Sequence, residues 1–371
     1  MKKVLVIAPY AYLPWRSGGQ KFIAQFLQYL GKQTELTVVS VAENDASQAG
    51  RYRLIPLLKK GFSRYYDLSL VKKISALVKE QAVDTIIWEH PYMAWLAFRV
   101  RKKTGVKTLI HTHNIEYQRF RSTGRWWWPI LKYYERWCFK KADGIFFITP
   151  EDRQFAIRQW KIAADKCFEL PFGIELKEHP TDRARCRETI VHRHGIAPGE
   201  KILLFTGALA YPPNLQALQL ILDKINPLLM QHKGFAYKIL VCGGGLPPAL
   251  NNLEGYRDQH LLYAGFSADI DVYYKAADLF LNPVLSGGGI KTKMVESIAF
   301  GTTVISTQTG AIGIDRELCG NKLLLIADDD IKGFADKVFE QSQLAQEETP
   351  LSYYQQYHWE SIIAQLLKGA I

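Results

Sequence analysis

Hydrophobic residues occur in short runs along the first half of the chain, separated by stretches with helical spacing. Val4 to Ala8 is one such run, and comparable runs predict strands at 36–41, 85–88, 107–111 and 144–148. Apolar positions three and four residues apart predict the intervening helices at 21–32, 67–81, 92–104 and 129–142. Uninterrupted apolar runs are typical of strands covered on both faces. The alternation therefore predicts a doubly wound α/β domain with a parallel sheet.

The second half repeats this order of elements. Strands are predicted at 201–205, 237–241, 261–264, 278–283, 303–306 and 323–327. Since 371 residues exceed the usual size of one domain, the sequence predicts two Rossmann-like domains, residues 1–175 and 201–354. A polar, arginine-rich linker region at 176–200, with some helix in it, separates them, and residues 355–371 form a last segment.

Composition narrows the class of protein. The hydrophobic fraction of 48% suffices for two cores, and no apolar run approaches the length of a transmembrane helix. The five cysteines are odd in number, widely spaced and without a Cys-x-x-Cys pair, which argues against a disulfide framework and against structural zinc. A cytoplasmic location fits this pattern best.

Positive charge and tryptophan are concentrated in the first half. Residues 1–180 hold 30 of the 47 Lys and Arg, 16 of the 36 Asp and Glu, and eight of the nine tryptophans. Nucleic acid, an anionic membrane surface or an anionic acceptor would each suit a basic, aromatic face. No nucleic-acid-binding module is recognisable, so we expect no nucleic-acid partner.

The main candidate for chemistry is a glycine-rich segment that runs into a predicted helix ending at Gly301. It begins Gly287, Gly288, Gly289, Ile290, Lys291, Thr292, Lys293. Loop amides and the positive end of a helix suit phosphate oxygens. Glu296 lies about two helical turns after the glycines and can accept hydrogen bonds from a ribose diol. The segment therefore predicts a sugar-nucleotide site, with a simple Lys293–Glu296 surface pair as the alternative.

Two other loops follow predicted strands. One is residues 16–20 with Gly18 and Gly19; the other is residues 206–214 with Gly207, Tyr211 and Asn214. Both lie at the carboxyl ends of strands, where open α/β sheets bind ligands, so we expect both to contribute to donor binding. For Gly18 and Gly19 the alternative is an ordinary tight turn.

Metal binding is not expected. Asp269 and Asp271 have the spacing of a metal motif but precede a predicted helix, whose start they are expected to cap. His111 and His113 point the same way on an extended segment, yet no third ligand is recognisable. A buried histidine that hydrogen-bonds to backbone is the alternative for His113. We therefore predict neither a metal nor another cofactor.

The glycine-rich segment resembles the donor-binding signature of family 4 glycosyltransferases of the GT-B fold. Three further blocks are similar to that family: the His113 to Glu116 block, the Leu170 to Glu175 turn, and Tyr357 to Glu360. The resemblance implies two Rossmann-like domains facing across a cleft, with the last helix packing back on the first. It implies retaining transfer from a nucleoside diphosphate sugar held by the second domain, an acceptor bound by the first, and catalytic His113 near the transferred sugar.

Two departures from the family pattern concern the donor site. Gly288 stands where the family has its first Glu, and Ala208 and Pro213 stand near the usual Arg and Lys. Lys291 or Lys293, with the loop amides, is our hypothesis for the replacement. The rival interpretation is a catalytically inactive GT-B-like protein that serves as a membrane-associated scaffold or glycan-binding protein.

A second basic and aromatic stretch contains Arg125, Trp126, Trp127 and Trp128. Adjacent tryptophans cannot all face one core, and tryptophan flanked by arginine is typical of segments that rest on lipid headgroups. A loop packed over the core, or an oligomer contact, is the alternative. We expect a glycan or lipid-linked acceptor, peripheral contact with the inner face of the plasma membrane, and a role in cell-envelope polysaccharide synthesis.

Overall fold

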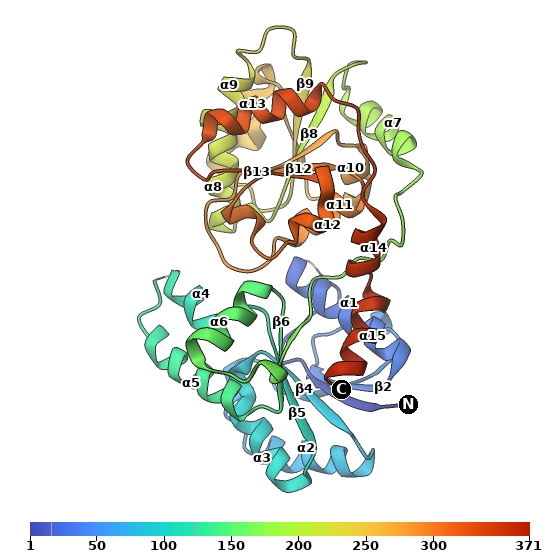
Figure 1. The fold of residues 1–371 in the computed structure, drawn as a ribbon, viewed down its shortest axis with the longest axis vertical. Helices are drawn as coiled ribbons and strands as arrows, with labels where there is room; N and C mark the ends of the chain where they lie inside the picture. The colour runs from blue at the N-terminus through green and yellow to red at the C-terminus, as the bar shows by residue number, and fades with distance from the viewer. Residues whose placement is uncertain (16, 123) are drawn as a thin grey trace. The chain divides into compact units, whose positions relative to one another are not determined.

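The computed structural model describes residues 1–15, 17–122 and 124–371, which form two compact units (Figure 1). The N-terminal unit comprises Met1–Gly173 and Tyr357–Ile371, and the C-terminal unit comprises Ile174–Gln356. The sequence analysis set its domain limits at residues 175 and 355. Each unit contains one parallel sheet with helices, so the predicted α/β class is confirmed.

The sheet of the N-terminal unit has seven parallel strands in the order β3-β2-β1-β4-β5-β6-β7. The strands are β1 (Lys3–Ile7), β2 (Glu35–Val41), β3 (Arg53–Leu58), β4 (Thr85–Glu89), β5 (Lys107–Thr112), β6 (Gly144–Phe147) and β7 (Cys167–Glu169). The helices are α1 (Gly18–Gln33), α2 (Ser69–Glu80), α3 (Ala94–Thr104), α4 (Glu116–Ser122), α5 (Trp128–Lys141), α6 (Pro150–Trp160) and α15 (Trp359–Gly369).

The sheet of the C-terminal unit has six parallel strands in the order β10-β9-β8-β11-β12-β13. The strands are β8 (Lys201–Thr206), β9 (Tyr237–Cys242), β10 (Leu261–Gly265), β11 (Leu279–Asn282), β12 (Thr303–Thr307) and β13 (Leu323–Ile326). The helices are α7 (Arg183–His194), α8 (Pro212–Leu220), which continues through a π-helical turn (Ile221–Ile225) into α9 (Asn226–Leu229), α10 (Ile270–Ala276), α11 (Thr292–Ala299), α12 (Arg316–Cys319), α13 (Ile331–Ser342) and α14 (Leu351–Tyr357).

Burial on both faces explains why the strands are continuous apolar runs. Successive side chains of a strand point to opposite faces of the sheet. In β1, Leu5 and Ile7 pack into a core with residues of α2 and α3, while Val4 and Val6 are equally buried. Both sheet faces are therefore covered, as the runs predicted.

Two edge strands of the N-terminal sheet were not predicted from the sequence. Strands β3 and β7 lie at the two edges of the N-terminal sheet. Pro56 interrupts the apolar pattern of β3, and proline is tolerated there because an edge strand lacks one neighbour. Helix α7 occupies the predicted linker and packs against α10, so that segment belongs to the C-terminal unit.

The last helix belongs to the N-terminal unit. Trp359 is fully buried, its indole Nε1 donates to Gln25 Oε1 at 3.2 Å, and its ring centroid lies 5.5 Å from that of Phe22. A side chain at Gly173 would lie about 2.4 Å from the indole ring of Trp359, so only glycine fits there. The chain thus leaves the N-terminal unit at residue 173 and completes it again from residue 357.

Candidate active site

The glycine loop before α11 has a backbone that only glycine adopts easily. Gly287 and Gly289 have φ angles of 93° and 70°, in the left-handed region. The amides of Gly287, Gly288 and Gly289 donate no hydrogen bond to any described residue. The loop therefore presents three backbone donors that are unpaired within the described part of the chain, an arrangement that suits an anion.

Lys291 closes this loop from the carbonyl side. Its Nζ donates to the carbonyl oxygens of Gly287 at 3.1 Å, Gly288 at 3.4 Å and Gly289 at 2.9 Å. One ammonium thus fixes the three carbonyls, and the amides point elsewhere. Burial lowers the pKa of Lys291 to about 8.

Lys293 connects α11 to the end of β8. Its Nζ donates to the Thr206 carbonyl at 3.0 Å and to Asn214 Oδ1 at 3.2 Å, while Asn214 Nδ2 donates to the Ala208 carbonyl at 3.1 Å. Burial and then the charge of Lys291 lower the pKa of Lys293 to about 7. The two predicted loops of this unit are therefore held by two lysines of the same segment, the glycine loop by Lys291 and the loop after β8 by Lys293.

Other predicted donor residues border the same loops. A side chain at Gly207 would lie 2.7 Å from the Asn214 amide, and one at Gly287 would lie 3.4 Å from Tyr211 Oη. Burial raises the pKa of Tyr274, and the charge of Glu296, about one turn into α11, raises it further. The Tyr274 hydroxyl shares a 2.9 Å hydrogen bond with Thr206 Oγ1. The donor-binding role of Ile290 stays a prediction.

The two aspartates with metal-motif spacing lie elsewhere in the unit. Asp269 occupies the N-cap position of α10, but its carboxylate makes no cap bond; it accepts from Arg193 Nη2 at 2.9 Å and from Ser267 Oγ at 2.5 Å. Asp271 lies in the first turn of the same helix. The expected helix start is present, but the capping role predicted for Asp269 is wrong because an arginine takes the carboxylate.

The predicted loop at residues 16–20 is not a loop throughout. Gly18 and Gly19 form the first turn of α1, and Ser17 Oγ caps it by accepting from the Gln20 amide at 3.4 Å. Arg16 lies outside the described residues. Neither glycine has a positive φ, so the predicted phosphate loop is here a capped helix start.

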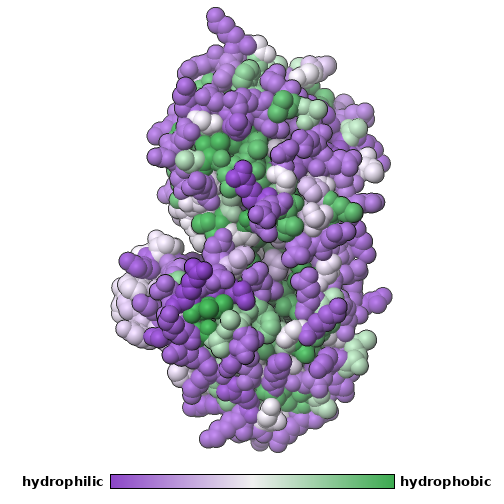
Figure 2. Space-filling view, in the orientation of Figure 1, coloured by the Kyte–Doolittle hydropathy of each residue, from purple (hydrophilic) through white to green (hydrophobic). Residues whose placement is uncertain are grey.

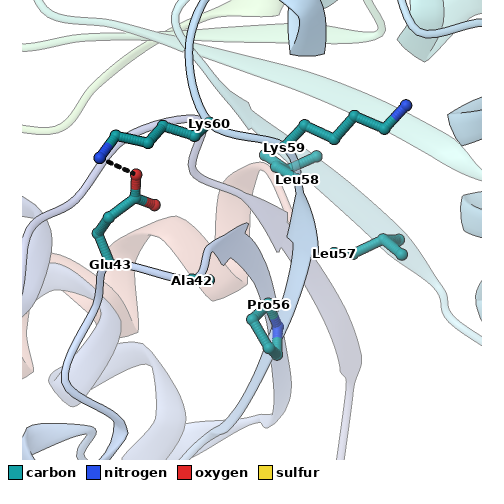
Figure 3. Close-up of a pocket in the computed structure, with 7 residues that line it drawn as sticks. All are labelled: Ala42, Glu43, Pro56, Leu57, Leu58, Lys59 and Lys60. Atoms are coloured by element: carbon teal, nitrogen blue, oxygen red, sulfur yellow. Dashed lines mark ion pairs between the residues drawn. The ribbon is translucent and has the colours of Figure 1, made fainter.

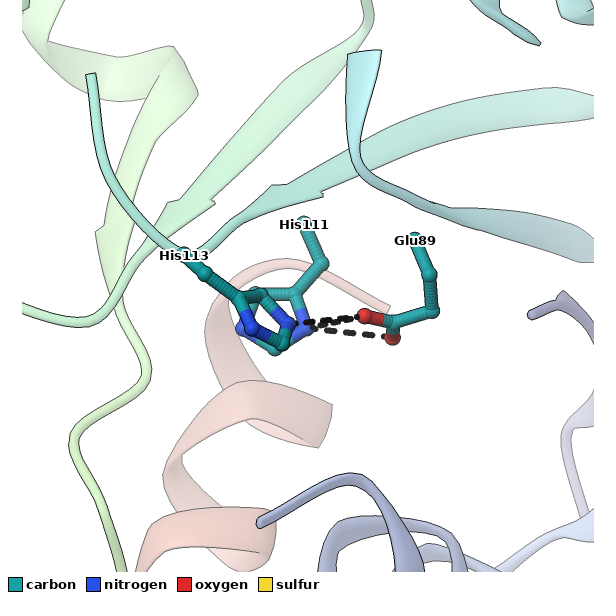
Figure 4. Close-up of side chains that lie close together, drawn as sticks. All are labelled: Glu89, His111 and His113. Carbon is teal, nitrogen blue, oxygen red and sulfur yellow. Dashed lines mark hydrogen bonds and ion pairs between the residues drawn. The ribbon is translucent and has the colours of Figure 1, made fainter. Parts of the chain in front are cut away.

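A buried cluster of histidines and carboxylates occupies the carboxyl ends of β4 and β5. Glu89 and His111 are register partners on adjacent strands and are both inaccessible to solvent. His111 Nδ1 lies 3.0 Å and His113 Nε2 lies 3.2 Å from the Glu89 carboxylate (Figure 4). Burial opposes ionisation of Glu89, but the two histidines outweigh it and its pKa falls to about 2.

A second carboxylate and histidine adjoin this cluster. His90 Nδ1 lies 3.4 Å from Glu116 Oε1, and the rings of His90 and His113 are 4.3 Å apart. Glu116 Oε2 accepts from Tyr92 Oη at 2.7 Å and from Arg119 Nη2 at 2.6 Å. His90 has φ 65° and ψ 154°, which is strained for a residue with a side chain. Strain of this kind is concentrated at functional sites.

The atom types of the first group would suit a transition-metal ion. One oxygen of Glu89 and one nitrogen each of His111 and His113 lie within 4.8 Å of one another. However, a metal-bound histidine normally donates its other N–H to an acceptor. His111 Nε2 has no partner among the described residues. The donor set therefore fits a hydrogen-bonded network better than a metal centre.

The aromatic stretch before α5 divides between core and surface. Trp126 is 82% exposed, whereas Trp127 and Trp128 pack against the hydrophobic core of α5 and β6. Of the predicted outward-facing residues Arg125, Trp126, Trp127 and Trp128, only Arg125 and Trp126 are exposed. Side chains of intermediate hydropathy form a pale group at this loop, at the left of Figure 2.

One hollow of the N-terminal unit lies away from the predicted site residues. A hollow of about 460 Å³ lies beyond the ends of β2 and β3, lined by Ala42, Glu43, Pro56, Leu57, Leu58, Lys59 and Lys60 (Figure 3). It contains none of the predicted site residues.

Within the described part of the chain, no helix has the length and apolar character needed to cross a bilayer.

Two family models match the chain. The model described as Glycosyltransferase Family 4 matches residues 16–178, and the model described as Glycosyl transferases group 1 matches residues 200–342. The chain belongs to the family 4 glycosyltransferases of the GT-B fold. The predicted family and enzyme class are thereby confirmed, and the residues of its site stay predictions.

Similar proteins agree with this family. A Klebsiella pneumoniae protein described as an uncharacterized 44.6 kDa protein in the cps region is 23% identical, with 89% of each chain covered. Sucrose-phosphate synthase from Thermosynechococcus elongatus has a TM-score of 0.73 at 16% identity, covering 99% of this chain and 98% of that one. Anabaena HepE, solved with UDP and glucose, has a TM-score of 0.71 at 12% identity, covering 99% of both. These structures show that the glycosyltransferase has the GT-B fold.

Sequence reasoning missed Glu89, His90 and the pairing of Glu116. Glu89 ends β4 and His111 lies near the end of β5. A signal was present, because the carboxyl ends of neighbouring parallel strands meet at one sheet edge. A carboxylate ending one predicted strand and a histidine ending the next could have been paired on that ground.

Proposed function

We propose that the C-terminal unit binds the diphosphate of a nucleoside diphosphate sugar on the loop of Gly287, Gly288 and Gly289. The observation that carries this proposal is the loop itself: its three amides have no partner among the described residues, while Lys291 holds the carbonyls. Preorganised donors of this kind stabilise charge that develops on a leaving diphosphate. Glu296 then accepts hydrogen bonds from the ribose diol, about one helical turn along α11.

Lys293 supplies the cation that the loop after β8 lacks. Its ammonium contacts Thr206 and Asn214, on either side of Ala208 and Pro213, the positions near the missing Arg and Lys. The missing Arg and Lys are one of the two departures that motivated the scaffold interpretation, the other being Gly288 in place of the first Glu. This contact therefore supports an active glycosyltransferase over an inactive scaffold. The UDP and UDP-glucose complexes of Anabaena HepE also favour a nucleotide-sugar donor.

The proposed reaction is transfer of the sugar, with retention of anomeric configuration, to a glycan or lipid-linked acceptor. His113 is the proposed catalytic residue beside the transferred sugar, and the basic N-terminal unit is proposed to bind the acceptor. The cps-region description of the Klebsiella relative supports a role in cell-envelope polysaccharide synthesis. No metal or other cofactor takes part in this proposal.

A screen with nucleoside diphosphate sugars tests the donor. A ligand at about one hundred times its dissociation constant adds roughly 2.7 kcal/mol of stability, so a thermal shift should identify the donor, and slow hydrolysis of that donor should follow. Glu296→Ala should abolish the shift, while Glu317→Ala, an exposed acid on α12, should leave it unchanged. A parent protein that responds to no sugar nucleotide would contradict the proposal.

Peripheral membrane contact is proposed for the outer face of α5. Ile130, Tyr133 and Trp137, spaced three and four residues apart, are 68%, 72% and 38% exposed, and Trp126 precedes them. Arg125 and Lys140 are exposed beside them. An apolar, aromatic helix face bordered by basic residues suits an anionic lipid surface.

Vesicle sedimentation tests this contact. Joint replacement of Trp126, Ile130 and Tyr133 by Ser should reduce binding to phosphatidylglycerol vesicles without altering donor binding. Phe62→Ser with Tyr66→Ser is the matched control, because those side chains are 79% and 72% exposed on the same unit but lie on a different segment. Equal sedimentation of the triple variant and the parent would favour a contact of another kind.

A further inference from the structure

We propose that Glu89 is a positioning residue that fixes the His113 ring with its Nε2–H on the carboxylate and its Nδ1 lone pair free for a sugar hydroxyl. This inference rests on the proposed function, in which His113 meets the transferred sugar. Glu89 itself touches no ligand. It acts by setting which ring nitrogen of His113 is the hydrogen-bond acceptor.

Glu89 is ionised and therefore determines the tautomers of the two histidines that contact it. Its side chain is fully buried, and both of its carboxylate oxygens lie within 3.2 Å of imidazole nitrogens. An ionised carboxylate only accepts hydrogen bonds, so each imidazole nitrogen facing it must donate. His111 is therefore protonated on Nδ1 and His113 on Nε2, since the hydrogen bond at one ring nitrogen fixes the tautomer.

His113 exposes its Nδ1 atom to a ligand. Its side chain is 13% exposed, and Nδ1 is neither engaged with a described residue nor among the buried atoms that lack a partner. Nδ1 is thus the accessible atom of the ring. Burial, followed by the nearby His90, lowers the pKa of His113, so the ring stays neutral and this nitrogen keeps its lone pair.

Aromatic packing holds the His113 ring in one orientation. Three aromatic neighbours surround His113: Phe22 at 5.4 Å, His111 at 4.7 Å and His90 at 4.3 Å between ring centroids. A ring flip would turn Nε2 away from Glu89 and leave a buried anion with one donor fewer. The packing and the carboxylate together hold one orientation.

Glutamine at position 89 would reverse the polarity of His113. The amide has one oxygen and one NH₂ group, so one of the two histidines must accept from it. If His111 accepted on Nδ1, its proton would move to Nε2, which has no acceptor among the described residues. His113 can instead carry its proton on the accessible Nδ1. Glu89→Gln therefore converts the presented atom from an acceptor into a donor.

The experiment compares the parent, Glu89→Gln, Glu89→Asp and Glu135→Gln in the full chain. Glu135 is an equally buried carboxylate that accepts from the Glu116 and Tyr117 amides at 2.8 and 3.1 Å. Nitrogen-15 NMR of labelled histidines should show the Nε2–H tautomer of His113 in the ligand-free parent, in Glu89→Asp and in Glu135→Gln. Glu89→Gln should show the Nδ1–H tautomer.

Binding of UDP and UDP-glucose supplies the second readout. The affinity gained by adding glucose to UDP should fall about tenfold in Glu89→Gln, the value of one hydrogen bond, while UDP itself binds within about twofold of the parent. If Glu89→Gln fails to fold, the tautomer of the parent and Glu89→Asp still decides the question.

Three results would overturn the inference: an Nδ1–H tautomer in the parent, an unchanged glucose increment in Glu89→Gln, or one equivalent of tightly bound metal that Glu89→Gln loses. A parent that binds no sugar nucleotide but shows the Nε2–H tautomer would count against the proposed donor site and not against the role of Glu89 in setting the tautomer.

Discussion

Two glycine-containing segments lie at helix starts in this glycosyltransferase, and they differ in backbone conformation and in proposed role. At α1, Gly18 and Gly19 are the first helical residues, and Ser17 satisfies the Gln20 amide. At α11, Gly287 to Gly289 stay outside the helix, and their amides have no partner in the described chain. Backbone conformation, rather than the number of glycines, distinguishes the two segments: Gly287 and Gly289 have positive φ outside their helix, whereas Gly18 and Gly19 are helical and have no positive φ.

The cause of the difference lies in the neighbouring side chains. Ser17 has a short hydroxyl that reaches back to its own helix, whereas Lys291 at the start of α11 has a long side chain that reaches back to the loop carbonyls. Serine caps a helix with an acceptor. Lysine only donates, so it fixes carbonyls and leaves amides available.

The largest expected effect is that of Lys293→Ala. This change removes a charged donor from the end of β8, and we expect diphosphate binding to weaken about 30- to 100-fold, as for the loss of a charge-assisted hydrogen bond. Isothermal titration with UDP would measure it. Lys21→Ala, in the first turns of α1, should bind UDP like the parent; an equal loss there would remove the distinction between the two helix starts.

A smaller effect is expected when glycine is replaced in each segment. Gly287→Ala forces a side chain to φ 93° beside Pro213 and Tyr211, which costs about 1–2 kcal/mol and should weaken UDP binding about tenfold. Gly19→Ala meets no atom within 4 Å and should raise the free energy of unfolding by up to about 1 kcal/mol. Chemical denaturation alongside titration separates the two outcomes, and matching behaviour of both variants would contradict the comparison.

A change of pH should affect UDP binding about as much as Gly287→Ala does. The pKa values of Lys293 and Lys291 are about 7 and about 8 in the free protein, and a bound diphosphate raises both because it stabilises the charged form. Affinity is therefore full below about pH 7 and falls as pH rises through the bound-state values. We expect about tenfold weaker UDP binding at pH 9 than at pH 7. Lys293→Ala should flatten this profile; a profile that rises with pH would argue against lysine as the diphosphate partner.

No change is expected on removal of divalent metal. The proposed donor site neutralises charge with amides and lysines, and Asp269 is already paired with Arg193. Transfer should therefore proceed in EDTA, and Asp269→Ala should retain activity. Loss of activity that manganese or magnesium restores would reinstate a metal at one of the acidic sites.

Much of the fold was readable from the sequence because buried parallel strands leave an unmistakable apolar run. Val4 to Ala8 predicted β1 to within one residue at each end. The edges were harder to predict. Only three residues form β7, and Pro56 interrupts β3, so neither segment has the uninterrupted run that marked the central strands.

The candidate site was readable where its residues are neighbours in the sequence, as from Gly287 to Glu296. It was less readable where contacts join distant segments. Lys293 meets Thr206 across 87 positions, and Glu89 meets His111 across 22. Only the strand order reveals such pairs. The direction of Trp127 and Trp128 likewise depended on a core that helical spacing alone does not define.

The placement of Trp359 sets the order in which the protein can be finished during synthesis. Domains generally fold as units, the N-terminal one first, as the chain leaves the ribosome. Here residues 1–173 emerge long before the indole that packs on Phe22 and Gln25. The apolar face of α1 must wait through translation of the whole C-terminal unit before its covering helix exists. The N-terminal unit is therefore the first to begin folding and the last to be completed.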